Sequence, residues 1–176
     1  LFPQIGLEKL VQHGIGEMRQ GSGGKSEFYI NREAWYSQAA WLKAFEGIAS
    51  SIGVQVLFKI GKNVPKHAVF PPQVKDIHAA LQSLDVAYHM NHRKGGHPMF
   101  NYNTGHMMEG IGHYKYEKRD KSKEALMVCE NPYPCDFDRG VIQGLAERFE
   151  AQVKVAHDTG PCRKKGENSC RYVVTW

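Results

Sequence analysis

Apolar residues in the first half of the chain recur every three or four positions, which is the spacing of amphipathic helices. Glycines at 21–24, 53 and 95–96 interrupt the pattern and separate three predicted helices. Their apolar stripes are Leu7, Leu10, Val11, Ile15 and Met18; Trp41, Phe45, Ile48 and Ile52; and Val74, Ile77, Leu81, Leu84 and Tyr88. The second helix is expected to begin after Asn31, a good cap residue, while residues 54–70 fit either a short helix or a strand.

From Phe100 onward the apolar period changes to two, which predicts strands. The segments 100–117 and 124–129 are expected to form a hairpin around the charged turn KRDKSK. A helix with the stripe Phe137, Val141, Leu145 and Phe149 follows, and then strands over 151–157 and 169–176. This order predicts an α+β fold: an antiparallel sheet with the N-terminal helices packed on it and a helix inserted between the C-terminal strands.

The composition is that of one globular domain: 176 residues, 41% hydrophobic, with a formal charge of +5. We expect a single ligand-binding domain over 1–176, with a mainly helical half at 1–95 and a strand-rich half at 96–176 that carries the cysteines. No apolar run approaches the roughly 18 residues of a membrane span. Lysines and arginines are scattered among acids, which argues against a nucleic acid partner.

The four cysteines fall in the last part of the chain as two pairs, Cys129 with Cys135 and Cys162 with Cys170. Each pair ends a strand or lies in a turn, so folding would bring four soft ligands together, and thiolates favour zinc. Buried free thiols and a disulfide or redox pair are the alternatives. The chain shows no basic, apolar leader, so we expect a cytoplasmic location, where disulfides are rare.

The third predicted helix carries a second row of polar residues beside its apolar stripe: His78, Asp85, His89 and His92. At about 100° per residue these side chains fall in a narrow band, so they are able to line a pocket at the edge of the core. The alternative is that histidines in the last turn simply interact well with the helix dipole.

The stretch from Gly112 to Trp176 resembles the C-terminal half of the 4-vinyl reductase domain. The resemblance rests on YPCDFDRGVIQGLAERF and HDTGPCRKKGENSCRYVVTW, and above all on the seven-residue turn between Cys162 and Cys170 with Gly166 inside it. That family shares its fold with haem nitric-oxide/oxygen binding domains and a Golgi transport component. The resemblance therefore implies a small-molecule input module of a bacterial-type signalling or transcription regulator.

The resemblance also implies a structural zinc held by Cys135, Cys162 and Cys170. The family's fourth ligand is an acid, but the matching position here is Thr159, so another residue must complete the site. Cys129, His157 and Asp158 are the candidates; we favour Cys129, because it would give an all-thiolate site, and place His157 second.

We therefore expect a sensory domain, not an enzyme, that binds a small hydrophobic or aromatic molecule, with zinc as its cofactor and with a homodimer and an output domain as its partners. Neither GxSxG nor HExxH nor a phosphate loop occurs in the chain. Candidate ligand-binding residues are Trp41, Phe45, Tyr88, His89, His92, Phe100, Tyr102 and His106.

Two other functions compete with this one. A haem-based sensor of nitric oxide is one alternative, although the YxSxR motif of the haem domains is absent. A thiol or zinc redox switch is the other, because Cys135 directly precedes a predicted helix, whose N-terminus stabilises a thiolate.

Overall fold

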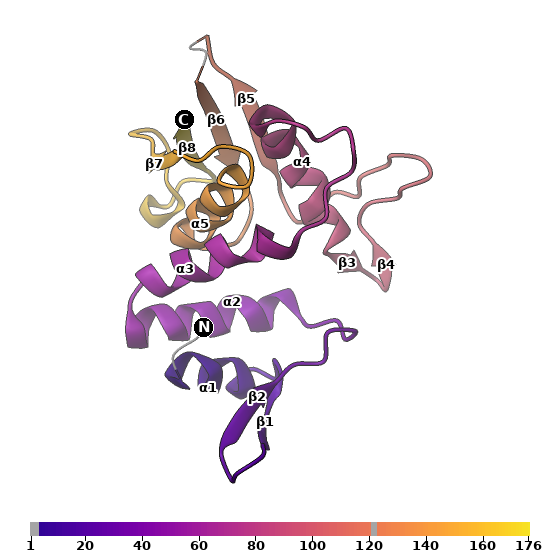
Figure 1. Cartoon of the computed structure of the whole chain (residues 1–176), viewed down its shortest axis with the longest axis vertical. Helices are drawn as coiled ribbons and strands as arrows, with labels where there is room; N and C mark the ends of the chain where they lie inside the picture. The colour runs from indigo at the N-terminus through magenta and orange to yellow at the C-terminus, as the bar shows by residue number, and fades with distance from the viewer. Residues whose placement is uncertain (1–3, 121–122) are drawn as a thin grey trace.

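The computed structural model describes residues 4–120 and 123–176, so positions 121–122 of the predicted KRDKSK turn lie outside the described residues (Figure 1). The helices are α1 (Gln4–Gln12), α2 (Gln38–Ile52), α3 (Gln55–Asn63), α4 (Ile77–Met90) and α5 (Cys135–Ala146), with short 3-10 turns at Val64–His67 and Arg163–Lys165. The strands are β1 (Glu17–Gln20), β2 (Ser26–Tyr29), β3 (Arg93–Lys94), β4 (His97–Pro98), β5 (Tyr114–Lys118), β6 (Glu124–Cys129), β7 (Lys154–His157) and β8 (Cys170–Thr175). The fold is α+β, as the pattern predicts.

Helix α4 follows the sequence pattern closely. Its cap is Asp76, whose side chain accepts a hydrogen bond from the Ala79 amide at 2.8 Å. The predicted stripe of Ile77, Leu81, Leu84 and Tyr88 is buried against the sheet. The helix ends at Met90, and a small β3–β4 hairpin occupies the residues on either side of the two glycines.

Other boundaries differ from the prediction for local reasons. Helix α1 stops at Gln12 because Gly14 and Gly16 adopt positive φ angles of 73° and 72°, which places Met18 in strand β1 instead of on the helix. Helix α2 begins at Gln38, well after Asn31. The ambiguous segment 54–70 forms helix α3 and a 3-10 turn.

Between Phe100 and β5 the chain forms a loop, where the sequence predicts a strand. A single antiparallel bridge joins Phe100 to Met107, and β5 begins only at Tyr114. Glycines at positions 105, 110 and 112 have positive φ angles, which are incompatible with an extended strand.

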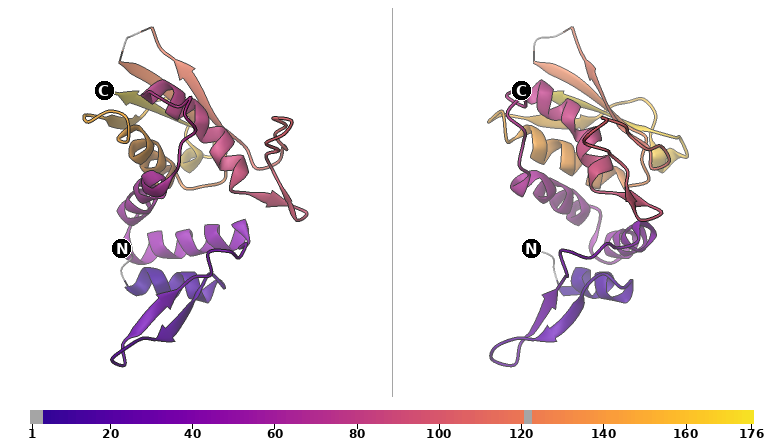
Figure 2. Two further views of the ribbon diagram at one scale, coloured as in Figure 1. Left: turned by 45° about the vertical axis from the view of Figure 1, so that its right-hand side comes forward. Right: turned by 90° about the vertical axis from the view of Figure 1, so that its right-hand side faces the viewer.

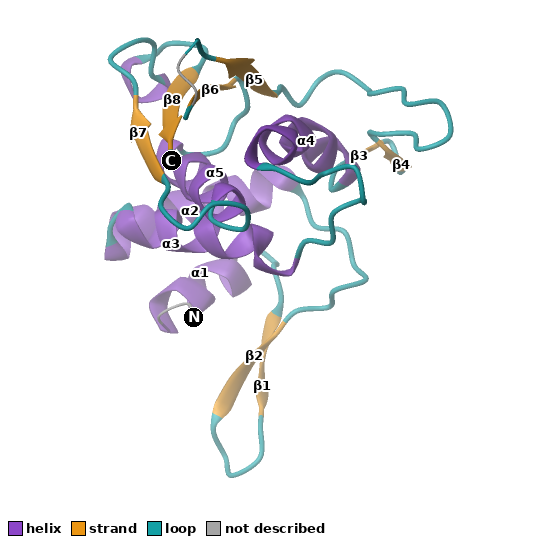
Figure 3. Ribbon diagram, turned by 45° about the horizontal axis from the view of Figure 1, so that its top comes forward, coloured by secondary structure: helices purple, strands orange, loops and turns teal. Residues whose placement is uncertain are grey.

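The C-terminal half contains a four-stranded antiparallel sheet in the order β5-β6-β8-β7. The hairpin partner of β5 is β6, as predicted, and β6 pairs with β8 so that Cys129 lies opposite Cys170. Helix α4 packs beside β5, and α5 packs near β7 and β8, as Figure 3 shows. The main core lies between these two helices and the sheet.

The other helices stack below this core: α3 packs against α5, α2 against α3, and α1 against α2 (Figure 1). Helices α3 and α5 approach closely because Gly61, Gly140 and Gly144 stand where a Cβ atom would overlap the opposite backbone. The β1–β2 hairpin projects away from the stack at the end opposite to the sheet, as the views in Figure 2 show. No helix among the described residues has the length and apolar character that a membrane span requires.

Candidate functional site

An aromatic cluster joins helix α4 to helices α2 and α5; its members are Trp41, Phe45, Tyr88, His92, Tyr133 and Phe137. Neighbouring rings lie 4.4–6.3 Å apart between centroids, mostly tilted or edge to face. Four of these residues belong to the predicted ligand-binding set, so the structure brings half of that set together. We call this group the α4 aromatic cluster.

His92 is the imidazole of this cluster. Its Nδ1 donates to the Tyr88 carbonyl at 2.6 Å, which leaves Nε2 as the acceptor of the Tyr133 hydroxyl at 3.0 Å. Burial lowers the pKa of His92, so the ring is neutral at pH 7. Burial also raises the pKa of the Tyr88 and Tyr133 hydroxyls, which keeps both protonated. The Gln38 amide lies beside these hydroxyls, yet its nitrogen is buried without a hydrogen bond of good geometry.

His89 belongs to the predicted set but faces a different way. Its side chain is completely buried, its Nδ1 donates to the Asp85 carbonyl at 2.8 Å, and its Nε2 has no partner. His78 lies apart from both, in the first turn of α4, where it bonds the Tyr116 hydroxyl at 2.6 Å and contacts Trp176. The predicted row of polar residues on α4 is thus divided among separate surroundings.

Phe100, Tyr102 and His106, the rest of the predicted set, lie on the loop between β4 and β5. They line an open cavity of about 610 Å³ together with residues of the same loop. Tyr102 is 72% exposed and its hydroxyl contacts the Met90 sulfur at 3.1 Å. The structure therefore separates this group from the α4 aromatic cluster.

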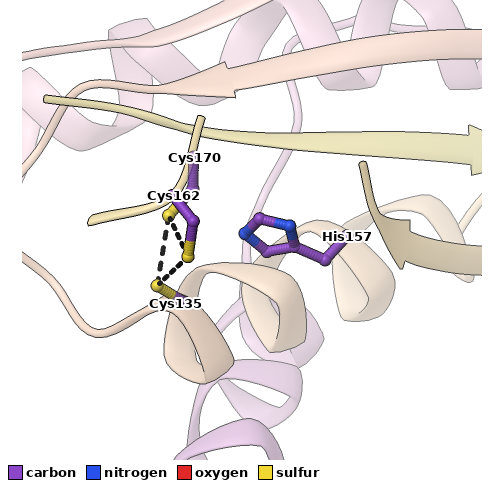
Figure 4. Close-up of side chains that lie close together, drawn as sticks. All are labelled: Cys135, His157, Cys162 and Cys170. Atoms are coloured by element: carbon purple, nitrogen blue, oxygen red, sulfur yellow. Dashed lines mark hydrogen bonds between the residues drawn. The ribbon is translucent and has the colours of Figure 1, made fainter. Parts of the chain in front are cut away.

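Three of the four cysteines meet where the N-terminus of α5 faces the turn before β8 (Figure 4). The Cys135 sulfur lies 3.1 Å from the Cys170 sulfur, and Cys162 is 3.9 Å from each. The imidazole of His157, at the end of β7, completes a group whose ligand atoms all lie within 4.8 Å of one another. This group, the Cys3His cluster, has the donors and spacing to hold a metal ion, and a cavity of about 320 Å³ lies beside it.

Cys129, which the sequence analysis favours as fourth ligand, lies outside this cluster. It is completely buried in the sheet core, and burial raises the pKa of its thiol well above the usual value. His157 takes the place that we expected for Cys129, because the end of β7 brings its imidazole beside the final turn. Thr159 is not part of the cluster; Asp158 instead accepts its amide hydrogen bond.

Arg163 controls the charge of the Cys3His cluster. Burial opposes a Cys170 thiolate, but hydrogen bonds from the Arg163 amide at 3.3 Å and Nε at 3.4 Å outweigh it and lower the pKa of Cys170 to about 6. Burial and the neighbouring Cys170 raise the pKa of Cys135 to about 12. A Cys170 thiolate beside a Cys135 thiol is therefore expected near pH 7.

Behind the cluster, Arg163 also binds Asp138, an acid with no solvent exposure. The other oxygen of Asp138 accepts the Tyr114 hydroxyl at 2.5 Å, and the Tyr114 ring lies 5.2 Å from that of Tyr88. The two groups are thus connected through buried polar contacts. Sequence reasoning missed Tyr133 and Asp138, although their position around the start of α5 placed them near Cys135.

Comparisons with known proteins rest on structure alone. No protein-family model and no curated protein sequence matches the chain. An H-NOX protein from S. oneidensis in the Fe(II) state is similar with a TM-score of 0.60 and 14% identity, over 96% of this chain and 83% of that one. An oxygen-binding H-NOX domain related to soluble guanylate cyclases gives 0.59 and 13%, over 97% and 84%. A Cs H-NOX variant gives 0.60 and 14%, over 99% and 88%. The chain therefore has the H-NOX fold.

These comparisons correct one expectation. The sequence predicts zinc as the cofactor and haem only as an alternative, but structures with this fold are studied as haem proteins, one of them for haem distortion. The prediction of zinc is contradicted. The broad recognition of the haem nitric-oxide/oxygen fold is confirmed, whereas the 4-vinyl reductase label is not.

Proposed function

We propose that this chain is a haem-based gas-sensing domain, with the haem bound at the α4 aromatic cluster. The observation that carries this proposal is His92, two residues beyond the end of α4, whose neutral imidazole is set among aromatic rings in a chain that shares its fold with H-NOX domains. A neutral histidine with one nitrogen fixed by a backbone carbonyl is the usual form of an axial ligand. Haem, when bound, would supply the iron at which a diatomic gas binds.

The residues of the cluster fit haem, because an imidazole is available to bind the iron and the neighbouring rings offer apolar surface. His92 would hold the iron through Nε2, in place of its hydrogen bond to Tyr133, while the Tyr88 carbonyl keeps the ring oriented. The rings of Phe45 and Phe137 supply apolar surface on the α2 and α5 sides. Tyr133, once released, is positioned to donate its hydroxyl to a polar ligand.

The test is an absorption spectrum of tag-free protein expressed with haem supplementation, with the His92→Gln variant compared with His67→Gln. We expect a Soret band and about one haem per chain in the wild type. His92→Gln should lose the band or shift it, whereas His67→Gln, which alters an exposed histidine of the 3-10 turn after α3, should keep it. Wild-type protein that stays colourless with added haem would overturn the proposal.

A second candidate is a sensor of a small aromatic molecule bound at the same cluster. The unpaired Gln38 nitrogen between two tyrosine hydroxyls favours it, because a buried donor without a partner is costly and a phenol-like ligand would satisfy it. Binding of phenol measured by calorimetry on haem-free protein, with Gln38→Leu as the variant that should lose it, distinguishes this function from the first.

We also make proposals about the organisation of the domain and its partners. We propose that residues 1–176 act as one cytoplasmic ligand-binding domain that dimerises and passes its signal to an output module, and that the strand-rich half carries the Cys3His cluster as a separate metal or thiol site. The relation of one neighbour to guanylate cyclases supports the output module. Light scattering during size-exclusion chromatography tests the dimer.

A further inference from the structure

A second group of metal-ligating side chains lies next to the α4 aromatic cluster, where the rings of Tyr88 and His89 are 5.3 Å apart. It consists of Asp85 and His89 of α4 and of His113, the residue before β5, and we call it the Asp85 cluster. One ligand atom from each of the three lies within 4.8 Å of the other two. The donors of a transition-metal site lie about 2 Å from the ion, so small side-chain adjustments would bring these three onto one ion.

The geometry points to a binding site for a divalent first-row transition-metal ion, held by the imidazoles of His89 and His113 and the carboxylate of Asp85. Two histidines and one carboxylate are the donors that bind iron(II) in non-haem sites and leave further positions open. Neither the α4 aromatic cluster nor the Cys3His cluster shares a residue with this group.

The strongest observation is the unpaired nitrogen of His89. The side chain has no solvent exposure, its Nδ1 is used by the Asp85 carbonyl, and its Nε2 has no hydrogen-bond partner among the described residues. A buried polar atom without a partner costs about 1–3 kcal/mol. The His89 nitrogen nearest to the Asp85 carboxylate is Nδ1, at 3.6 Å from Oδ1; a metal ion bound at Nε2 would use the free lone pair, with the backbone carbonyl fixing the ring as it does in known histidine ligands.

The other two ligands are already held in place by neighbouring groups. Asp85 Oδ1 accepts the Tyr114 amide at 2.9 Å, and Asp85 Oδ2 lies 2.9 Å from His113 Nδ1. The second nitrogen of His113 lies 3.0 Å from Glu109, whose side chain is mostly exposed. Without an ion, a protonated His113 donates one hydrogen bond to each carboxylate, which satisfies these contacts but leaves His89 unsatisfied.

The cluster is also accessible. The side chains of Asp85 and His113 are each 21% exposed, while His89 is closed off, so an ion can enter from the side of β5 and meet the buried ligand last. Two carboxylates, Asp85 and Glu109, lie on this entry side and attract a cation, and they also interact with the charge of Lys115, which is paired with Glu130.

The test is titration of Co²⁺ into chelator-treated, tag-free, haem-free protein, followed by absorption. Cobalt on thiolates gives intense near-ultraviolet charge-transfer bands, whereas a histidine and carboxylate site gives only weak visible bands, so the Asp85 and Cys3His clusters are distinguishable. We expect the wild type to show a weak visible component of the second kind, whether or not the Cys3His cluster adds thiolate bands. His113→Gln and Asp85→Asn should weaken it about 100-fold or more, since outer-shell changes alone cost about 10- to 100-fold.

The control is again His67→Gln, which should bind Co²⁺ as the wild type does. A wild-type spectrum with thiolate bands only, or unchanged binding in His113→Gln, would refute the site. Because a variant can misfold, the wild type is also examined by NMR: Co²⁺ should shift or broaden the ring signals of His89 and the amide of Tyr114, and unchanged signals at saturation would refute the site as well.

Discussion

At the scale of single residues, the buried carboxyl group of Asp138 makes the stability of the folded protein depend on pH. Burial raises the pKa of Asp138 to about 7, against the opposing influence of Arg163, while an unfolded aspartate titrates near 3.9. Between about pH 4 and pH 7 the folded protein therefore binds more protons at this site than the unfolded chain. Its contribution to stability is complete below pH 4 and is lost as the pH rises through about 7, with a slope of up to about 1.4 kcal/mol per pH unit.

The prediction is that Asp138→Asn removes this slope. Asparagine keeps an oxygen that can accept the Tyr114 hydroxyl but has no proton to lose. Urea unfolding at pH 5, 6, 7 and 8 should show the wild type losing stability relative to the variant as the pH rises. Glu8→Gln, at an exposed position of α1, is the control and should run parallel to the wild type. A constant difference between wild type and Asp138→Asn would contradict the assignment.

At the scale of elements, the contact between α3 and α5 depends on glycine. A Cβ atom at Gly140 would overlap the backbone of Phe58 and Lys62, and neither backbone can move without shifting a helix. We expect Gly140→Ala to lower the free energy of unfolding by about 2 kcal/mol or more, the usual cost of overpacking a tight contact.

The matched control is Gly47→Ala in helix α2, where the nearest atom is the flexible Lys9 side chain at 3.1 Å. Alanine favours a helix interior by about 1 kcal/mol over glycine, so this variant should be neutral or more stable. Urea unfolding followed by circular dichroism measures both. Equal losses in the two variants would mean that the glycines matter through helix propensity and not through packing.

These elements also show what a sequence can reveal. Helix α4 was predictable because its cap, Asp76, and its apolar stripe are local signals. Helix α3 was ambiguous because Gly61 looks like a helix breaker. The structure shows that glycine is needed at this position because a Cβ atom would overlap the backbone of Phe137 on α5. The cysteines of the final turn and Cys135 could be foreseen from their positions before or within turns, but His157 in place of Cys129 depends on how β7 meets β8.

For the molecule as a whole, three cores are arranged along the stack of layers. The largest joins α4, α5 and the sheet; a second joins α1, α2 and the β1–β2 hairpin; the third, around Phe45, Ile48 and Leu57, connects them through α2 and α3. The α4 aromatic cluster lies where the third core meets the first, since Tyr133 and Phe137 belong to the surroundings of both. A ligand bound there would contact both halves of the molecule at once.

Ligand binding should therefore stabilise particular layers. Haem at 100 times its dissociation constant adds about 2.7 kcal/mol to the folded state. If it binds at the α4 aromatic cluster, amide hydrogen exchange should slow most in α2, α4 and the start of α5, and least in the β1–β2 hairpin, which projects away from the helix stack (Figure 2). Exchange mass spectrometry of haem-free and haem-loaded protein measures this. Protection confined to 93–112 would instead place the haem at the loop that carries Phe100, Tyr102 and His106, and would contradict binding between the two halves.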